Sequence, residues 1–168
     1  MTTIVYDTKL LVSDSQSSIG NEIYEEDCQK LFPNVGPFAV IGIAGNYQDS
    51  MDVIEVISDY NKMDHIRGLD FEELDWQCAM LGVTHEGQVW HYSGKHSFEL
   101  RSDMPFAIGS GAQYAMGAMY AGAGAELALE AASRFDIDTN NIKQIATLDY
   151  GRPEEPEVTK DPEEPTQH

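Results

Sequence analysis

The sequence predicts an α+β fold in which helices cover sheets. Short β-rich runs fall into two blocks, over residues 4–44 and 76–108, and segments with helical apolar spacing lie between these blocks and after the second. The length of 168 residues favours one domain with a proper core. The composition changes at Gly151, so we expect a folded domain over residues 2–150 and a separate tail over residues 151–168.

Strands dominate the first part of the chain. Ile4–Tyr6 and Leu10–Ser13 are β-rich runs separated by a tight break, which predicts a hairpin, and Asp27–Phe32 is a further candidate strand. The continuous apolar run Phe38–Ala44 is typical of a strand that is buried on both faces. These segments form the first block of strands.

A helix, the second block of strands and two further helices follow. The first helix is predicted over Asp49–Lys62, because its apolar residues recur at i, i+3, i+4 and i+7, and Asp49 can cap its start. The sequence THEG separates two β-rich runs and predicts a second hairpin. In order, the remaining elements are strands Trp76–Val83, Gln88–Ser93, Phe98–Leu100 and Phe106–Ile108, helices Ala112–Ala121 and Glu126–Phe135, and strand Ile142–Leu148.

Charge and composition exclude several classes of protein. The 29 acidic residues outnumber the 10 Lys and Arg residues, and the net charge of −19 excludes a free-standing nucleic-acid binder and disfavours anionic membranes. No apolar run approaches the roughly 20 residues of a membrane span, and the N-terminus lacks the features of a secretory signal. Cys28 and Cys78 are too few for a disulfide framework or a four-ligand zinc site. We therefore expect a soluble, cytoplasmic protein.

The last eighteen residues differ from the rest. Residues 151–168 contain four prolines and six acidic residues but a single aliphatic residue, Val158. Such a segment cannot bury enough apolar surface to offset the entropy lost on ordering. We therefore predict an acidic, proline-rich, disordered tail.

A threonine directly follows the initiator methionine. Methionine aminopeptidases remove Met before small residues, so Thr2 would become the first residue of the mature chain. A free N-terminal threonine combines a hydroxyl nucleophile with an α-amino base, whose pKa is about 7.7–8.0 in peptides. Alone this feature has no weight, because many chains begin Met-Thr.

Several motifs follow Thr2 in order and give it significance. They are TTIVY, DSQSSIGN with Lys30 at the matching distance, AVIGIAGNYQD, AIGSGAQYAMGAMYAG and, more weakly, DIDTNNIKQIATL. Together they resemble the proteasome β-subunit family and, within it, the HslV-type peptidases, over about residues 2–150. The resemblance implies the N-terminal nucleophile (Ntn) hydrolase fold, a four-layer αββα sandwich of two antiparallel sheets between helices. It also implies a threonine endopeptidase that requires no cofactor.

The resemblance assigns catalytic roles by position. Thr2 matches the nucleophile, Lys30 the lysine beside its hydroxyl, and Asp14 the acid that pairs with this lysine. Gly42 matches the residue whose backbone N–H stabilises the oxyanion. The outer set that hydrogen-bonds the threonine amine is matched by Ser110, Asp136 and Thr139.

The resemblance also implies a substrate pocket and an ion site. The pocket would be lined by Ser17, Ser18, Cys28, Phe32, Val40 and Ala44. None of these residues is charged, so we expect cleavage after apolar residues such as Leu, Tyr or Phe. A monovalent cation such as sodium would be held by the backbone carbonyls of Ser133, Asp136 and Thr139.

Assembly and two other functions complete the expectations. The family forms stacked homomeric rings, so we expect rings held by the helices over Asp49–Lys62 and 112–121, and an ATP-dependent unfoldase partner is left open. The chain between Gly45 and Ser110 is shorter than in HslV, so a helix is expected to shrink to a turn near Leu69–Leu74. The alternatives are a catalytically silent ring subunit, acting as scaffold or regulator, and an Ntn hydrolase of small amides.

Overall fold

Two antiparallel sheets form the centre of the molecule. The structure is a computed structural model, and it describes residues 2–19, 22–67, 77–93 and 96–148. One sheet has the order β10-β1-β2-β11 and the other the order β5-β6-β7-β8-β9, and β3 and β4 form a separate hairpin. The strands of the first sheet are β1 Thr3–Tyr6, β2 Leu10–Ser13, β10 Phe106–Gly109 and β11 Gln144–Thr147. Those of the second are β5 Leu31–Val35, β6 Phe38–Gly45, β7 Cys78–Thr84, β8 Val89–Ser93 and β9 His96–Leu100, and the hairpin consists of β3 Ser17–Ile19 and β4 Glu22–Glu25.

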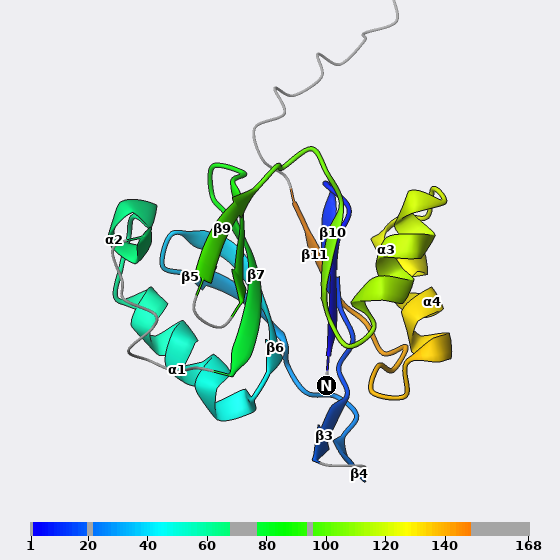
Figure 1. The fold of residues 1–168 in the computed structure, drawn as a ribbon. Coiled ribbons are helices and arrows are strands. Elements are labelled where there is room, and N and C mark those ends of the chain that lie inside the picture. Colours follow the sequence, from blue (N-terminus) through cyan, green and yellow to red (C-terminus); the bar gives the residue numbers. More distant parts are fainter. Residues whose placement is uncertain (1, 20–21, 68–76, 94–95, 149–168) are drawn as a thin grey trace, which may run out of the picture.

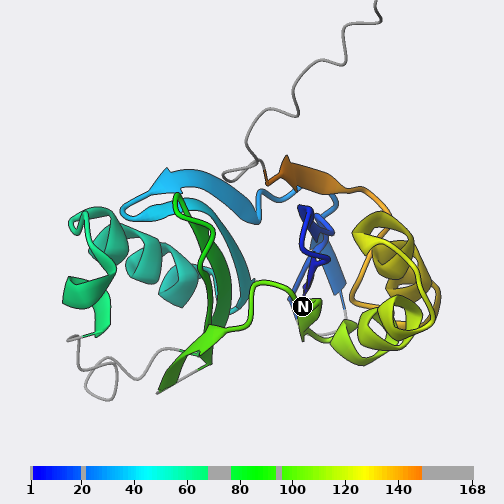
Figure 2. The same ribbon diagram turned by 90° about the horizontal axis from the view of Figure 1, so that it is seen from above.

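Helices lie on the outer faces of both sheets. They are α1 Tyr47–Ser58, α2 Met63–Arg67, α3 Ala112–Tyr120 and α4 Ala125–Phe135. Figures 1 and 2 show the sheets facing each other, with α1 and α2 outside the five-stranded sheet and α3 and α4 outside the four-stranded sheet. One buried apolar cluster lies between the sheets, and one lies between each sheet and its helices. The α+β fold predicted from the sequence is confirmed.

The strands at the centre are buried on both faces because each packs against two layers. In β1, Ile4 and Tyr6 belong to the cluster between the sheets, whereas Val5 belongs to the cluster beneath α3 and α4. In β6, Val40 faces the other sheet and Ile41 faces α1. This alternation follows from the period of two in a strand and explains why these segments are almost continuously apolar.

Both predicted hairpins form, but some element ends differ. Helix α1 begins at Tyr47, two residues before the predicted start, because Asn46 is its N-cap and accepts a hydrogen bond from the Asp49 amide at 3.1 Å. The Asp49 carboxylate instead accepts from the Gln77 amide at 2.7 Å. The helix ends at Ser58 instead of Lys62.

Further features differ from the prediction, among them the short helix α2, which was not predicted. The strand expected over Asp27–Phe32 begins only at Leu31. The β3–β4 hairpin was not predicted, because the described residues of β4 are all exposed and its sequence has no alternation of apolar and polar residues. The tail over residues 151–168 and the turn near Leu69–Leu74 lie outside the described residues. No helix in the described ranges is long and apolar enough to cross a membrane.

Gly42 should not tolerate a side chain. A Cβ at this position would lie 2.7 Å from Ile4 Cγ2 and 3.1 Å from Leu31 Cδ2. Gly42→Ala should therefore push the sheets apart and lower the free energy of unfolding by about 1–3 kcal/mol. Gly117→Ala is the matched control, since nothing lies within 4 Å of the added Cβ and alanine favours the helix. Urea unfolding measures both, and a Gly42→Ala protein as stable as the wild type would contradict this packing.

Candidate active site

Thr2 directly precedes Thr3, the first residue of β1. Its carbonyl accepts a hydrogen bond from the Ser110 amide at 2.9 Å, and the residue is only 6% exposed. Gly109 permits this approach, because its φ is +96° and a Cβ there would lie 1.7 Å from the Thr2 carbonyl oxygen. The next amide, that of Thr3, donates to Asp14 Oδ1 at 2.9 Å. The backbone around Thr2 is therefore held on both sides.

Lys30 and Asp14 form a buried ion pair close to Thr2. The Lys30 ammonium lies 3.1 Å from each carboxylate oxygen of Asp14, and it also donates to the Gln16 carbonyl. Asp14 is fully buried and Lys30 is 5% exposed. Burial is the largest influence on both groups, lowering the pKa of Lys30 and raising that of Asp14, while their mutual attraction opposes both shifts. The ammonium is thus easier to deprotonate than an ordinary lysine.

The side chain of Gln144 positions the segment that carries Lys30. Its Oε1 accepts from the amides of Lys30 at 2.9 Å and Leu31 at 3.0 Å, and its Nε2 donates to the Cys28 carbonyl at 2.7 Å. This side chain supplies hydrogen-bond partners of the kind that a neighbouring strand would supply. No motif in the sequence indicated this role.

The Asp136 carboxylate accepts hydrogen bonds from two hydroxyl groups. Its Oδ2 accepts from Ser110 Oγ and Thr139 Oγ1, each at 2.6 Å. Thr139 Oγ1 in turn lies 2.7 Å from Thr3 Oγ1. Burial raises the pKa of Asp136, but hydrogen bonds from Ser110, Thr139 and the Asp138 amide outweigh it, so the pKa is lowered. The structure thus brings the predicted outer set together, in contact with Thr3.

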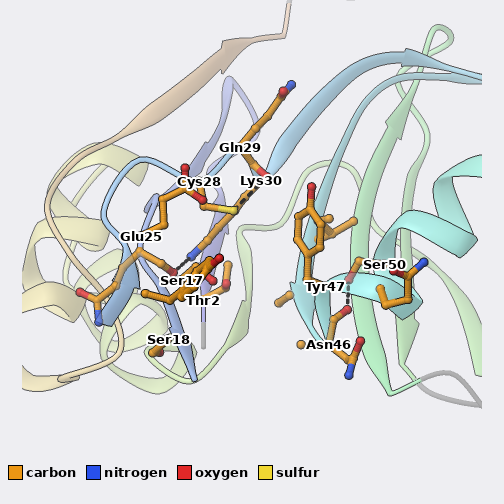
Figure 3. Close-up of a pocket in the computed structure, with 16 residues that line it drawn as sticks. Thr2, Ser17, Ser18, Glu25, Cys28, Gln29, Lys30, Asn46, Tyr47 and Ser50 are labelled. Atoms are coloured by element: carbon orange, nitrogen blue, oxygen red, sulfur yellow. Dashed lines mark hydrogen bonds between the residues drawn. The ribbon is translucent and has the colours of Figure 1, made fainter. Parts of the chain in front are cut away.

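A cavity of about 650 Å³ opens beside Thr2 and Lys30. Figure 3 shows Lys30 extending towards Thr2 and Ser17 on one wall, with Asn46 and Tyr47 on the facing wall. Its remaining lining residues are Gln16, Ser18, Tyr24, Glu25, Cys28, Gln29, Ile43, Ala44, Gly45, Gln48 and Ser50. Ser17, Ser18, Cys28 and Ala44, four of the residues expected in the substrate pocket, therefore line this cavity.

Phe32 and Val40 do not line this cavity. Phe32 is paired with Ile41 and packs against the cluster beneath α1, whereas Val40 is buried between the sheets. The side of a strand that a residue occupies depends on the register, which the motifs do not give. Tyr24, Glu25 and Tyr47 were missed, because exposed residues of a hairpin and a helix start carry no pattern in the sequence.

Gly45 occupies the place expected of Gly42. The amide groups of an antiparallel strand point alternately to its two neighbours. The Asn46 amide donates towards β7, to the Gln77 carbonyl at 2.9 Å, so the Gly45 N–H points the other way, on the side of β5. By the same alternation the Gly42 N–H points into the β6–β7 ladder. Gly42 lies outside the cavity that Gly45 lines, and its predicted place in the site is corrected.

The predicted ion site spans the end of α4 and the residues that follow it. Ser133 is in the last turns of this helix, and the Asp136 carbonyl accepts from the Thr139 amide at 3.2 Å. A carbonyl oxygen has two lone pairs, so this bond leaves room for a cation. The described residues contain no cluster of three His, Cys, Asp or Glu side chains suited to a metal ion.

Comparisons with known proteins define the class of fold. No protein-family model and no curated protein matches the sequence. Among solved structures, eukaryotic HslV from Trypanosoma brucei is 20% identical, with a TM-score of 0.66 over 86% of this chain and 97% of that chain. Thiobacillus denitrificans BPH in complex with epoxomicin is 17% identical, with a TM-score of 0.67 over 90% and 99%. BPH from the same organism in another structure is 18% identical, with a TM-score of 0.65 over 88% and 96%. The chain therefore has the fold of HslV and BPH, and the resemblance noted in the sequence is confirmed at the level of the fold.

The buried ion pair should dominate local stability. Lys30→Met would leave the Asp14 carboxylate buried without its counter-charge, at a cost of about 3–5 kcal/mol. The double variant Asp14→Asn/Lys30→Met should be more stable than Lys30→Met, because the unpaired charge is gone. Urea unfolding of the single and double variants gives the coupling between the two residues.

An exposed ion pair supplies the control for this cycle. Arg101 Nη2 lies 2.7 Å from Asp103 Oδ2, and the two side chains are 72% and 66% exposed. Arg101→Met should therefore cost less than about 1 kcal/mol. If Arg101→Met and Lys30→Met lose the same free energy of unfolding, burial does not increase the contribution of the Asp14–Lys30 pair to stability.

Proposed function

We propose that this chain is a threonine endopeptidase of the proteasome β-subunit family, resembling HslV, and that Thr2 becomes its nucleophile when Met1 is removed. The observation that carries the proposal is the buried Lys30–Asp14 pair, whose lysine lines the same cavity as Thr2. The paired sheets with helices outside them fit the αββα sandwich of this class. Among known structures of this fold, BPH was solved with epoxomicin bound.

In the proposed reaction the free Thr2 amine takes the proton of its own hydroxyl, directly or through water, and the oxygen attacks the scissile carbonyl. The Lys30 ammonium stabilises the charge that develops on this oxygen. The Gly45 N–H donates to the oxyanion of the tetrahedral intermediate, which is worth about 3–4 kcal/mol. The protonated amine then gives its proton to the leaving nitrogen, and water hydrolyses the remaining ester.

The contacts of Thr3 support a nucleophile at position 2. The Thr3 hydroxyl accepts from the Gly111 amide at 3.0 Å and lies 2.7 Å from Thr139 Oγ1. Thr3 is fully buried and does not line the cavity, whereas Thr2 does. In the proposal the Asp136 cluster, through these contacts, fixes β1 and orients the amine of Thr2.

We further propose that the chain assembles into stacked homomeric rings in the cytoplasm, so that the threonines face an enclosed chamber. Large apolar side chains on or next to α3 and α4 are exposed to water in the single chain. Contact with another subunit would bury them. They are Tyr114, Met116, Tyr120, Leu127, Phe135 and Ile137. Exposed apolar patches mark contacts with other proteins, and Tyr120 in this group is 96% exposed. An unfoldase partner would deliver folded substrates to such a chamber.

A monovalent cation bound by the carbonyls of Ser133, Asp136 and Thr139 is proposed as a structural ion. It would stiffen the loop that holds the Asp136 carboxylate. No step of the proposed reaction uses it.

Removal of Met1 and reaction at Thr2 are testable together. Intact-mass spectrometry should show a chain that begins at Thr2, and epoxomicin should add once to it. Thr2→Ala should abolish both epoxomicin addition and peptide cleavage. Thr3→Ser keeps the buried hydroxyl and should retain most activity. An active protein that retains Met1 quantitatively would exclude this mechanism, and an unreactive Thr2 would favour a silent subunit.

Assembly should depend on the face formed by α3 and α4. Light scattering at micromolar concentration should give a mass several times 18.7 kDa. Tyr120→Glu and Leu127→Glu should each shift the protein towards the monomer, because a charge would be buried in the contact. Met104→Glu, at a site that is also exposed, should not. A wild-type protein that is only monomeric would contradict the ring.

A further inference from the structure

The cavity beside Thr2 carries a negative charge that is not neutralised. Glu25 and Lys30 are the charged residues among those that line it. The Lys30 ammonium is already bound to Asp14 and to the Gln16 carbonyl. Glu25 is exposed and forms no ion pair with another described residue. Among the described side chains that line the cavity, Glu25 is therefore the charged one that has no ion-pair partner.

Glu25 lies on the β3–β4 hairpin, next to another residue that lines the cavity. Glu25 ends β4 and pairs with Ser17, which also lines the cavity. Burial is the main cause of the raised pKa of the Cys28 thiol, and the Glu25 carboxylate adds to it. The negative charge of Glu25 thus affects the pKa of Cys28, which lies two residues before Lys30 in the sequence.

Two tyrosines also line the cavity and remain largely uncovered. Tyr24 is 74% exposed and Tyr47 is 58% exposed. Figure 3 shows Tyr47 on the wall that faces Lys30. The face of a tyrosine ring attracts cations, most often the guanidinium of arginine.

The rest of the lining suits an aliphatic chain. Cys28, Ile43 and Ala44 are buried and give part of the cavity an apolar surface. Lysine and arginine are the side chains that combine a long apolar stem with a cationic end, and they pack the stem on apolar surface while the charge stays in a polar setting. A leucine would cover the same apolar surface but would leave Glu25 without a partner.

We propose that the cavity selects a basic side chain, arginine or lysine, on the acyl side of the scissile bond (P1). This inference rests on the proposed peptidase function and adds its substrate class. It replaces the preference for apolar P1 residues predicted from a lining without charge. Glu25 binds the cation, Tyr47 and Tyr24 offer their ring faces, and the apolar wall packs against the stem.

The test is a set of fluorogenic peptides that differ only at P1, which is arginine, its uncharged isostere citrulline, or leucine. Wild-type enzyme should cleave the arginine peptide with the highest kcat/KM. Glu25→Gln should lower kcat/KM for arginine by about fivefold, the size of one partly exposed ion pair, and leave citrulline unchanged. Glu22→Gln removes the same charge from the same hairpin outside the cavity and should have little effect.

A second pair of variants tests the aromatic contact. Tyr47→Phe keeps the ring and should retain the preference for arginine over citrulline, whereas Tyr47→Leu should reduce it. Faster cleavage after leucine than after arginine, or equal effects of Glu22→Gln and Glu25→Gln, would overturn the proposal and leave the peptidase intact. Absence of turnover for every peptide, together with no addition of epoxomicin to Thr2, would overturn the proposed function itself.

Discussion

The ion pair between Asp14 and Lys30 is the constraint on which the rest of the site depends. Two buried charges are tolerated only when each is fully paired, so the chain must bring the end of β2 and the start of β5 together. These two positions belong to opposite sheets. The remaining lone pairs of Asp14 are met by the amides of Thr3 and Gln16, at 2.9 and 3.1 Å. The pair thus fixes the relative position of the sheets and of the residue before β1.

Close packing around the start of β1 also holds Thr2 in position. Gly42 lets Ile4 approach the backbone of β6, and Gly109 lets the carbonyl of Thr2 approach β10. Both contacts bring the start of β1 close to its neighbours. Thr2 consequently occupies a fixed place beside Lys30 before any substrate binds, and little reorganisation is needed for the proposed reaction.

The sequence was sufficient for the features that depend on local pattern. Apolar runs gave β1, β2, β6 and the two hairpins, and the order of motifs indicated Asp14 and Lys30. Features that depend on strand register could not be predicted from the sequence. The direction of an amide distinguishes Gly45 from Gly42, and the face of a strand separates Phe32 from the cavity. The same limit applies to the cap of α1, where Asn46 and Asp49 are both good capping residues and only the contact with Gln77 decides between them.

The three hydrogen bonds of the Gln144 side chain bear on when the site can exist during synthesis. Lys30 precedes Gln144 by 114 residues. The amides of Lys30 and Leu31 and the carbonyl of Cys28 find their partner only in β11, the last described strand. A growing chain therefore carries Lys30 long before it can hold the backbone of this residue in place. The distance of Gln144 along the chain delays the ordered Lys30 segment until most of the described domain has been made.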